Sequence, residues 1–491
     1  MNTMKKPYPP FGMPCAEGPG ELPEVVFGPM PMMMSGPGGP GGPGGPGGPG
    51  GPGDPEGPGG PGGPPPKREK PTLAAAVRIS DGQAHEDPDQ IQGGKITSTS
   101  AEALKVHSDA PLLGGVYVKG GSEYTIDGAD IYLKGNSNDD FSGVGAAVMA
   151  DEGATVTLKN AKIVTDGVVR TATIATNGSK MYVYNSHLET HGGILPADYT
   201  PRIGPGMLEP PAPLGIGGTC RTNLTMENSE SYFYDSTILA NGWGALSTDS
   251  AKDRVYLEAN RCNVIVKDTG YCAYADGNCH DVFNDCTFTT PDMAAIIAGK
   301  SDVTYTNTAA DCGGNFAMMH CVMGMLTEVS ELHVNGGRVT AGADVVLVKS
   351  ANSYIAFRGT EITAKNGVLI HSVINSDPMA THPNGEDVYG INVALRDVQV
   401  SGDILHEDHE RTMAVTLENT LFTGAIQNTY LKIEHGSKWT ASGASDVVLV
   451  DMDSLDGIDA CAGITINAAA GANCTLHGAH TLPSGGTIII E

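Results

Sequence analysis

The sequence predicts an all-β protein built as a β-solenoid, a coil of stacked and similar turns of chain. From about Ala74 onward, short β-rich runs broken by Gly, Asn and Asp replace any helical period. The same strand–turn–strand pattern recurs about a dozen times, mostly at intervals of about 22–29 residues. Regular spacing of this kind is typical of repeat architectures.

Residues 1–73 form a leader that cannot build a core. The segment from Gly36 to Pro66 consists almost entirely of Gly-Gly-Pro, and a methionine cluster precedes it. This composition predicts a disordered, flexible or polyproline-like segment. Gly at every third place also satisfies the collagen rule, so a trimerising stalk is the alternative, although Asp54 and Glu56 interrupt the pattern. The β-solenoid domain is expected over residues 74–491.

Each copy of the repeat consists of a strand, a turn residue, a small residue and a second alternating strand, as in the segment 156–165. The turn residues are mostly Asn, Asp or Gly, which favour turns for backbone reasons. They are Gly128, Asn160, Asn185, Asp235, Arg261, Asp285, Asn307, Gly336, Gly359, Asp397, Asn419 and Gly436.

The residue after the turn is small in most of the repeats. This column contains Ala161, Ser186, Ser236, Cys262, Cys286, Thr308, Gly337, Thr360 and Thr420. We expect these side chains to stack inward, because a larger side chain would collide with the next rung. Cys262 and Cys286 are therefore predicted to be buried small hydrophobic residues rather than metal ligands.

A second motif, a strand opened by Gly, follows many of these turns, for example at Gly167, Gly242, Gly270, Gly367 and Gly402. Each repeat then holds three short strands. One such unit cannot bury its apolar face alone, whereas stacked copies share a continuous core. A β-sandwich is the competing fold, but it would not repeat the same turn chemistry so many times.

Over roughly residues 90–490 the pattern resembles the pectate-lyase-like superfamily. The resemblance lies in rung length and in stacked Asn/Asp turns, not in a catalytic signature. It implies a right-handed, single-stranded parallel β-helix of about twelve or more rungs. The superfamily includes polysaccharide lyases, hydrolases, epimerases, tailspikes and adhesins, so the resemblance implies a fold without selecting one function.

Composition narrows the range of partners. The 491 residues include 56 acidic and 29 basic side chains, a formal charge of −27. This excess of negative charge disfavours nucleic acids and anionic membranes as binding partners. No apolar run approaches the roughly 18 residues of a membrane span, and no apolar segment follows the early lysines as in a secretion signal. We therefore expect a cytoplasmic protein without membrane insertion.

The turn that closes the Gly-opened strand gathers polar residues on successive rungs, which stack about 4.8 Å apart. His371 and His406 each lie four residues after the Gly that opens their strand. We expect their rings to stack within about 5 Å of each other, next to Glu407, Asp408 and His409. Imidazole beside carboxylate is suited to acid–base catalysis. His406, Asp408 and His409 would alternatively bind a divalent metal, whose identity the sequence leaves open.

A second polar cluster combines Asp249, Asp253 and Arg254 with Asp276 and His280 on the next rung. Paired carboxylates suit glycoside cleavage, where one must be protonated and the other ionised. With an arginine alongside and a metal as electrophile, they also suit proton abstraction next to a carboxylate. The interpretation that the turn preferences of Asp, Asn and Ser favour for both clusters is a set of solvated turn residues, and the functional sites are the alternative.

Two insertions, near 193–219 and 371–390, are expected to leave the solenoid at this same turn and to wall or cover a cleft. Tyr199 and Arg202 in the first insertion and His382 in the second are candidate substrate contacts. Trp243 begins a strand at the same edge. It is predicted to pack in the core or at a turn, with stacking on a sugar or an aromatic ring as the alternative that would make it a substrate contact.

These features favour an enzyme, namely a lyase, hydrolase or isomerase that acts on a carbohydrate or another polyhydroxylated small molecule. Its His/Asp acid–base chemistry would take place in a cleft on one edge of the solenoid. The main alternative is a non-catalytic carbohydrate-binding or adhesin-like protein. A trimeric fibre, a homo-oligomer with the leader as its stalk, is the third hypothesis.

Overall fold

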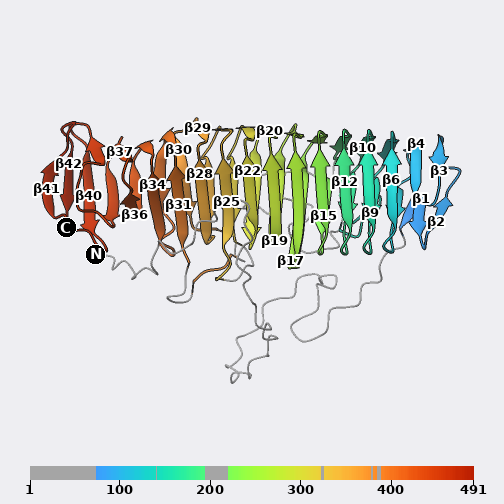
Figure 1. Cartoon of the computed structure of the whole chain (residues 1–491), viewed down its shortest axis with the longest axis horizontal. Helices are drawn as coiled ribbons and strands as arrows, with labels where there is room; N and C mark the ends of the chain where they lie inside the picture. The colour runs from blue at the N-terminus through green and yellow to red at the C-terminus, as the bar shows by residue number, and fades with distance from the viewer. Residues whose placement is uncertain (1–72, 140, 194–218, 322–325, 377–379, 384–388) are drawn as a thin grey trace, which may run out of the picture. The chain divides into compact units, whose positions relative to one another are not determined.

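The computed structural model describes residues 73–139, 141–193, 219–321, 326–376, 380–383 and 389–491. The leader up to residue 72, nearly all of the first insertion and part of the second lie outside the described residues. Within the described part, all regular secondary structure is β-strand, without any helix. The all-β prediction is therefore confirmed, and so is the β-solenoid, because successive rungs pair in parallel (Figure 1).

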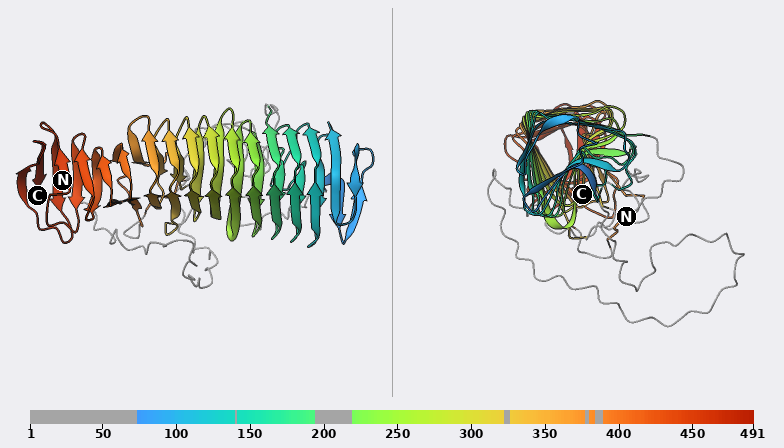
Figure 2. Two further views of the ribbon diagram at one scale, coloured as in Figure 1. Left: turned by 45° about the horizontal axis from the view of Figure 1, so that its top comes forward. Right: turned by 90° about the vertical axis from the view of Figure 1, so that its right-hand side faces the viewer.

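Three parallel columns of strands, here called sheets 1, 2 and 3, surround a common interior (Figure 2). Sheet 1 contains β1 (Ala74–Ser80), β5 (Leu113–Val118), β8 (Val148–Ala150), β11 (Thr173–Ala175), β14 (Cys220–Met226), the first parts of β17 (Trp243–Asn260) and β19 (Gly270–Asn284), β21 (Met293–Gly299), β24 (Ala317–His320), β27 (Val346–Lys349), β30 (Val368–Val373), β33 (Asp403–His406) and the first part of β36 (Ile426–Ile433). Sheet 2 contains the first part of β4 (Ser100–Ser108), β6 (Glu123–Asp127), β9 (Thr155–Lys159), β12 (Lys180–Tyr184), β15 (Glu230–Tyr234), the second parts of β17 and β19, β22 (Asp302–Thr306), β25 (Ser330–Asn335), β28 (Ser353–Arg358), β31 (Ile391–Arg396), β34 (Met413–Glu418), the second part of β36, β38 (Ser445–Leu449), β40 (Thr465–Ala470) and β42 (Thr487–Ile490).

Sheet 3 contains the second part of β4, then β7 (Asp130–Lys134), β10 (Lys162–Asp166), β13 (His187–His191), β16 (Thr237–Ala240), β18 (Asn263–Val266), β20 (Thr287–Thr290), β23 (Ala309–Cys312), β26 (Arg338–Ala341), β29 (Glu361–Ala364), β32 (Gln399–Ser401), β35 (Leu421–Thr423), β37 (Lys438–Ala441) and β39 (Ile458–Ala460). Antiparallel strands occur at the two ends of the solenoid. β2 (Gln83–Glu86) pairs with β1, β3 (Gly93–Ile96) pairs with β4, and β41 (Gly478–Thr481) pairs with β42. Such strands cover rung edges that would otherwise be open to another chain.

The corner between sheets 2 and 3 is built at the predicted turn residues. All twelve have a positive φ, from 47° at Asn185 and Asn419 to 88° at Gly436. Gly, Asn and Asp tolerate this left-handed backbone best, which explains their recurrence. Arg261 is the exception, with a φ of 52°, and its guanidinium forms an ion pair with Asp235 of the preceding rung at 2.7 Å.

The small residues after the turns form a ladder along the solenoid. The backbone N–H of Ser186 donates to Ser236 Oγ at 3.1 Å, and the N–H of Cys286 donates to Thr308 Oγ1 at 3.4 Å. These side chains are buried, and Cys262 is 2% exposed. The predicted inward column is therefore confirmed. Its hydroxyl and thiol groups satisfy backbone donors at a corner that has no space for larger side chains.

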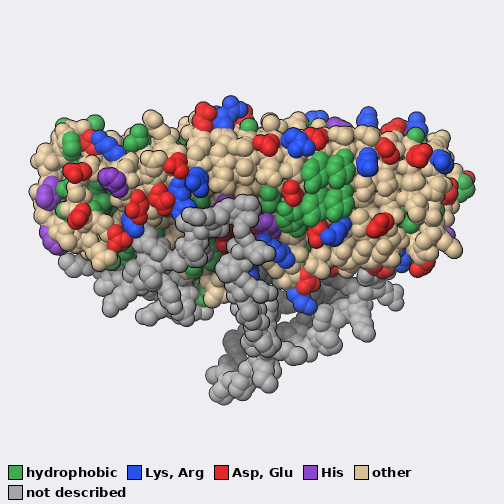
Figure 3. Space-filling view, in the orientation of Figure 1, with side chains coloured by type: hydrophobic (Ala, Val, Ile, Leu, Met, Phe, Trp, Pro, Cys, Tyr) green, Lys and Arg blue, Asp and Glu red, His purple; other side chains and the backbone are tan. Residues whose placement is uncertain are grey.

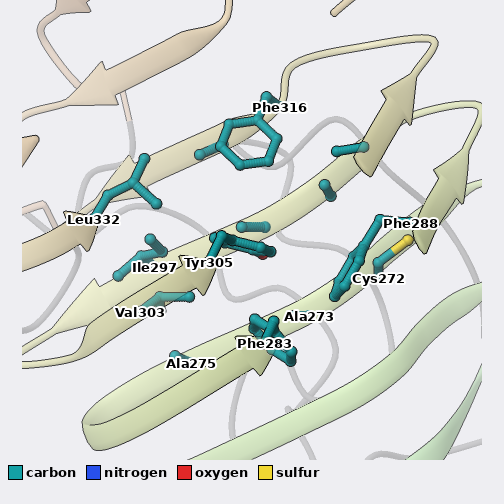
Figure 4. Close-up of a cluster of buried hydrophobic side chains, with 14 of the residues drawn as sticks. Cys272, Ala273, Ala275, Phe283, Phe288, Ile297, Val303, Tyr305, Phe316 and Leu332 are labelled. Carbon is teal, nitrogen blue, oxygen red and sulfur yellow. The ribbon is translucent and has the colours of Figure 1, made fainter. Parts of the chain in front are cut away.

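Inward-facing side chains of the three sheets fill the interior. In the middle rungs Phe283 packs against Phe288 and Tyr305, and Tyr305 against Phe316, with ring centroids 4.9–5.2 Å apart (Figure 4). Aromatic pairs at these separations add packing energy beyond the burial of their area. The core is thus continuous across rungs, as expected for stacked repeats that cannot bury their apolar faces alone.

The two insertions do not leave the solenoid at the same turn, so that prediction is wrong. The first follows β13 of sheet 3 and precedes β14 of sheet 1, whereas the second follows β30 of sheet 1 and precedes β31 of sheet 2. In the first case Gly192 and Gly193 follow the end of β13 at His191. The insertions therefore begin at the two opposite borders of sheet 1.

Replacing Asn185 with Val tests the turn chemistry, with Asn185→Gly as the matched control. A β-branched residue at a φ of 47° is strained, so Asn185→Val should lower the free energy of unfolding by about 1–2 kcal/mol relative to Asn185→Gly. Urea unfolding followed by circular dichroism measures the difference. Equal stability of the two variants would contradict the turn assignment.

Candidate functional site

The two histidines predicted to stack lie on opposite faces of sheet 1, so that prediction is wrong. An irregular register between Val368 and Ile370 places His371 beside Leu405 and Ser372 beside His406. Because side chains alternate along a strand, a shift of one residue reverses the face to which a side chain belongs. His371 faces outward and is partly exposed, whereas His406 points toward the interior and is 6% exposed.

His406 belongs to a buried structural network and not to a metal site. Its ring nitrogens lie 3.1 Å from Ser372 Oγ and 3.1 Å from the carbonyl oxygen of Arg411, and burial lowers the pKa of the imidazole. Asp408 forms a buried ion pair with Arg411 at 3.1 Å, and His409 is exposed. The predicted metal set of His406, Asp408 and His409 is therefore wrong, because its members are already engaged or point elsewhere. No group of three metal-ligating side chains occurs within the described ranges.

His371 forms an imidazole–carboxylate pair, but with a residue that was not predicted. Its Nδ1 lies 3.0 Å from Asp344 Oδ2, and this hydrogen bond raises the pKa of His371 above its usual value. Glu407, at 3.7 Å from Nε2, is beyond hydrogen-bonding distance. Asp344 precedes β27, one rung earlier in the sequence, and no repeat position singled it out.

The second predicted cluster divides between two sheets. Arg254 and His280 both pair with Asp302 on the outer face of sheet 2, Arg254 at 3.0 Å. Asp253 is exposed. The predicted convergence of Arg254 and His280 with the aspartates of sheet 1 is therefore wrong, because β17 and β19 continue without interruption around the corner into sheet 2.

Asp249 and Asp276 do lie side by side, as expected. They are in register on β17 and β19, which places them about 4.8 Å apart along the outer face of sheet 1. Both are only partly exposed. Burial, and then the charge of Asp249, raises the pKa of the Asp276 carboxyl to about 7. Two neighbouring carboxylates cannot easily ionise together, so one holds a proton near neutral pH.

Arg221 supplies the positive charge of this site. It lies on β14, in register with Gly244 of β17, and is 5% exposed. Its guanidinium carbon lies 5.1 Å from the ring centroid of Phe141 and 5.8 Å from that of Trp243. The charge of Arg221 opposes the upward shift in the pKa of Asp276 without cancelling it. Sequence reasoning missed Arg221, because its rung follows the first insertion and breaks the regular interval.

Trp243 is fully buried and offers no exposed face to a sugar ring. It packs edge-on against Tyr271, with ring centroids 5.5 Å apart, so it has the packing role that the sequence favoured. Its backbone adopts a φ of 75°, which is strained for a bulky residue. Strain of this kind concentrates at functional sites, and Trp243 begins the strand that carries Asp249.

A tyrosine–histidine pair extends the polar face beyond Asp276. The Tyr274 hydroxyl lies 3.1 Å from His320 Nε2. His320 is two rungs after Asp276 in the same outward row, with the small Ala298 between them. Sequence reasoning missed His320, although Asp276, Ala298 and His320 follow one another at intervals of 22 residues. This constant interval is the sequence signal that identifies His320.

The remaining candidate substrate contacts belong to the insertions. Tyr199 and Arg202 lie outside the described residues. His382 is exposed and pairs with Glu410 at 2.8 Å, away from the aspartate pair.

Because His371 lies four rungs from Tyr274 along one row, roughly 19 Å separates the His371–Asp344 pair from the Asp249–Asp276 site. The two sites cannot act on the same bond.

Comparisons of the chain with protein-family models, with curated proteins and with solved structures found no match. The described residues include no helix of the length and hydropathy that a membrane crossing requires. Function must therefore be inferred from the chemistry of the site itself.

The buried Asp408–Arg411 pair provides a test of its structural role. Arg411→Leu would leave the Asp408 carboxylate buried without its partner, at a cost of about 3–5 kcal/mol in the free energy of unfolding. The exposed Arg254 pairs with Asp302, and Arg254→Leu should cost at most about 1 kcal/mol. Chemical denaturation measures both values. Similar small losses in the two variants would show that Asp408 has no structural role.

Proposed function

We propose that the protein cleaves glycosidic bonds, with Asp276 as the general acid and Asp249 as its partner carboxylate. The observation that carries this proposal is the in-register pair whose surroundings keep Asp276 protonated up to about pH 7. Two carboxyl groups in different protonation states are what glycoside cleavage requires. No other pair of acids in the described residues combines outward orientation, register and a pKa raised to this range.

The rung spacing favours a double-displacement route. Side chains on adjacent rungs start about 4.8 Å apart, which corresponds to the closely spaced class of glycosidases, at about 5–5.5 Å. The Asp276 carboxyl would donate its proton to the glycosidic oxygen as that bond breaks, while an Asp249 oxygen bonds to the anomeric carbon. A water molecule, deprotonated by Asp276, would then attack the same carbon, release Asp249 and restore the starting protonation.

Neighbouring groups fit this chemistry. Arg221 moderates the negative charge beside Asp276, and Tyr274 of the same strand, with His320 two rungs further on, provides hydrogen-bonding groups on the same face. A lyase or isomerase reaction would instead need a strong base aimed at a carbon-bound proton. Because one member of the pair is protonated, the pair favours hydrolysis over a lyase reaction and over an isomerase reaction. Membership of the pectate-lyase-like superfamily remains part of this proposal and rests on rung length and turn chemistry.

Asp276→Asn tests the proposal directly. Loss of the general acid should lower kcat/KM by at least about 100-fold on any polysaccharide that the wild-type protein cleaves. For the wild type, activity should fall as the pH rises through about 7, because the ionised Asp276 cannot donate a proton. Release of reducing sugar measures both effects across a panel of neutral polysaccharides.

Asp253→Asn is the matched control, since Asp253 is an exposed acid of the same corner that does not reach the pair. It should retain activity. Full activity of Asp276→Asn, or an absence of product from every polysaccharide with the wild-type protein, would refute the proposed function.

A further inference from the structure

Five tyrosines gather on the outer face of sheet 2, on a different side of the solenoid from the aspartate pair. Hydrophobic-type side chains form a patch over β12, β15 and β17 in Figure 3. Their partial exposure contrasts with the buried residues that alternate with them along the same strands. The members of this tyrosine patch are Tyr182, Tyr184, Tyr232, Tyr234 and Tyr256.

The rungs hold these rings in continuous rows. Tyr182 stacks on Tyr232 at a centroid separation of 4.9 Å and an interplanar angle of 7°, and Tyr184 stacks on Tyr234 in the same way. Tyr256 is in register with Glu230, two residues before Tyr232, and its tilted ring lies 5.5 Å from that of Tyr232. His280 is in register with Tyr256 and stacks on it at 5.3 Å. Because the sheet already fixes each ring, the tyrosine side chains would lose little conformational entropy when a ligand binds.

Polar groups border the rings. The hydroxyl of Tyr232 donates to Glu230 Oε2 at 2.7 Å, and the hydroxyl of Tyr256 donates to Glu258 Oε2 at 2.7 Å. At the edge of the patch lies a hollow of about 360 Å³, lined by Asn228, Glu230, Tyr232, Arg254 and Tyr256. This open depression places an amide, a carboxylate and a guanidinium group beside two of the rings.

We propose that the tyrosine patch and its adjoining hollow bind a neutral glycan chain along the solenoid axis. Tyrosine rings offer apolar surface to the C–H faces of sugar rings, and the carboxylate, amide and guanidinium groups at their edges can hydrogen-bond to sugar hydroxyls. The formal charge of −27 and the acids within the patch disfavour a polyanionic glycan.

The length of the patch favours a chain over a single sugar. The contacting rings from Tyr182 to His280 span four rungs, roughly 15 Å along the solenoid axis, with a step of two residues between Tyr232 and Tyr256. An extended peptide would instead add to an open strand edge, whereas the patch lies on the face of a fully paired sheet. The proposed glycan site contains neither residue of the aspartate pair, so glycan binding can be tested separately from catalysis.

Native gel electrophoresis in the presence of soluble neutral polysaccharides tests the proposal. The panel contains mixed-linkage β-glucan, galactomannan, xyloglucan and dextran. At least one of them should retard the wild-type protein. The double variant Tyr232→Ala/Tyr256→Ala should bind at least tenfold more weakly, whereas Tyr232→Phe/Tyr256→Phe keeps the rings and should retain most of the retardation. Tyr132→Ala is the control, because Tyr132 is an outward tyrosine of sheet 3 with a hydroxyl–carboxylate contact to Asp166.

Three results would overturn the proposal. They are no retardation by any polysaccharide, retardation that survives the double alanine variant with its circular dichroism spectrum intact, or a dimer in light scattering that only this variant dissolves. In the last case the patch would be an interface between copies of the chain. Asp276→Asn should bind like the wild type, so a failure of catalysis and a failure of glycan binding remain distinguishable.

Discussion

Parallel rungs held in register about 4.8 Å apart determine where each polar side chain of this solenoid lies. The register is fixed most firmly at the corner between sheets 2 and 3. There a left-handed turn residue is followed by a small side chain whose oxygen or sulfur accepts a backbone N–H from the previous rung. A slip of one residue would expose the aromatic core and bury the outer polar rows, so the hydrophobic pattern opposes it.

This constraint accounts for the unusual chemistry of Asp249 and Asp276. Two acids separated by 27 residues become neighbours because each occupies the same position of its rung. Alternation along β19 then separates Asp276, which faces outward, from Asp281, which is 1% exposed and accepts a hydrogen bond from Thr248. A raised pKa in the folded state lowers stability as the pH rises from about 4 to about 7.

The sequence was sufficient to predict the features that depend on local sterics. The turn residues and the small column were identifiable because no other residue types fit a tight corner beneath a neighbouring rung. The Asp249–Asp276 pair followed from rung counting. The His371–His406 pair did not, because one irregular residue near Val368 reversed a face, and no composition signal marks such an irregularity. Arg254 and His280 were misplaced because the chain bends into sheet 2 within a continuous strand, without a turn signal.

The decisive quantity is the ionisation of Asp276 beside Asp249. A ¹³C carboxyl titration of aspartate-labelled protein, with Asp276→Asn used to assign the resonance, measures it without any substrate. A midpoint near 7 is expected for Asp276 in the wild type, and a lower midpoint in Asp249→Asn. A midpoint near 4 in both proteins, as for an exposed aspartate, would contradict the proximity and burial on which the proposed chemistry rests.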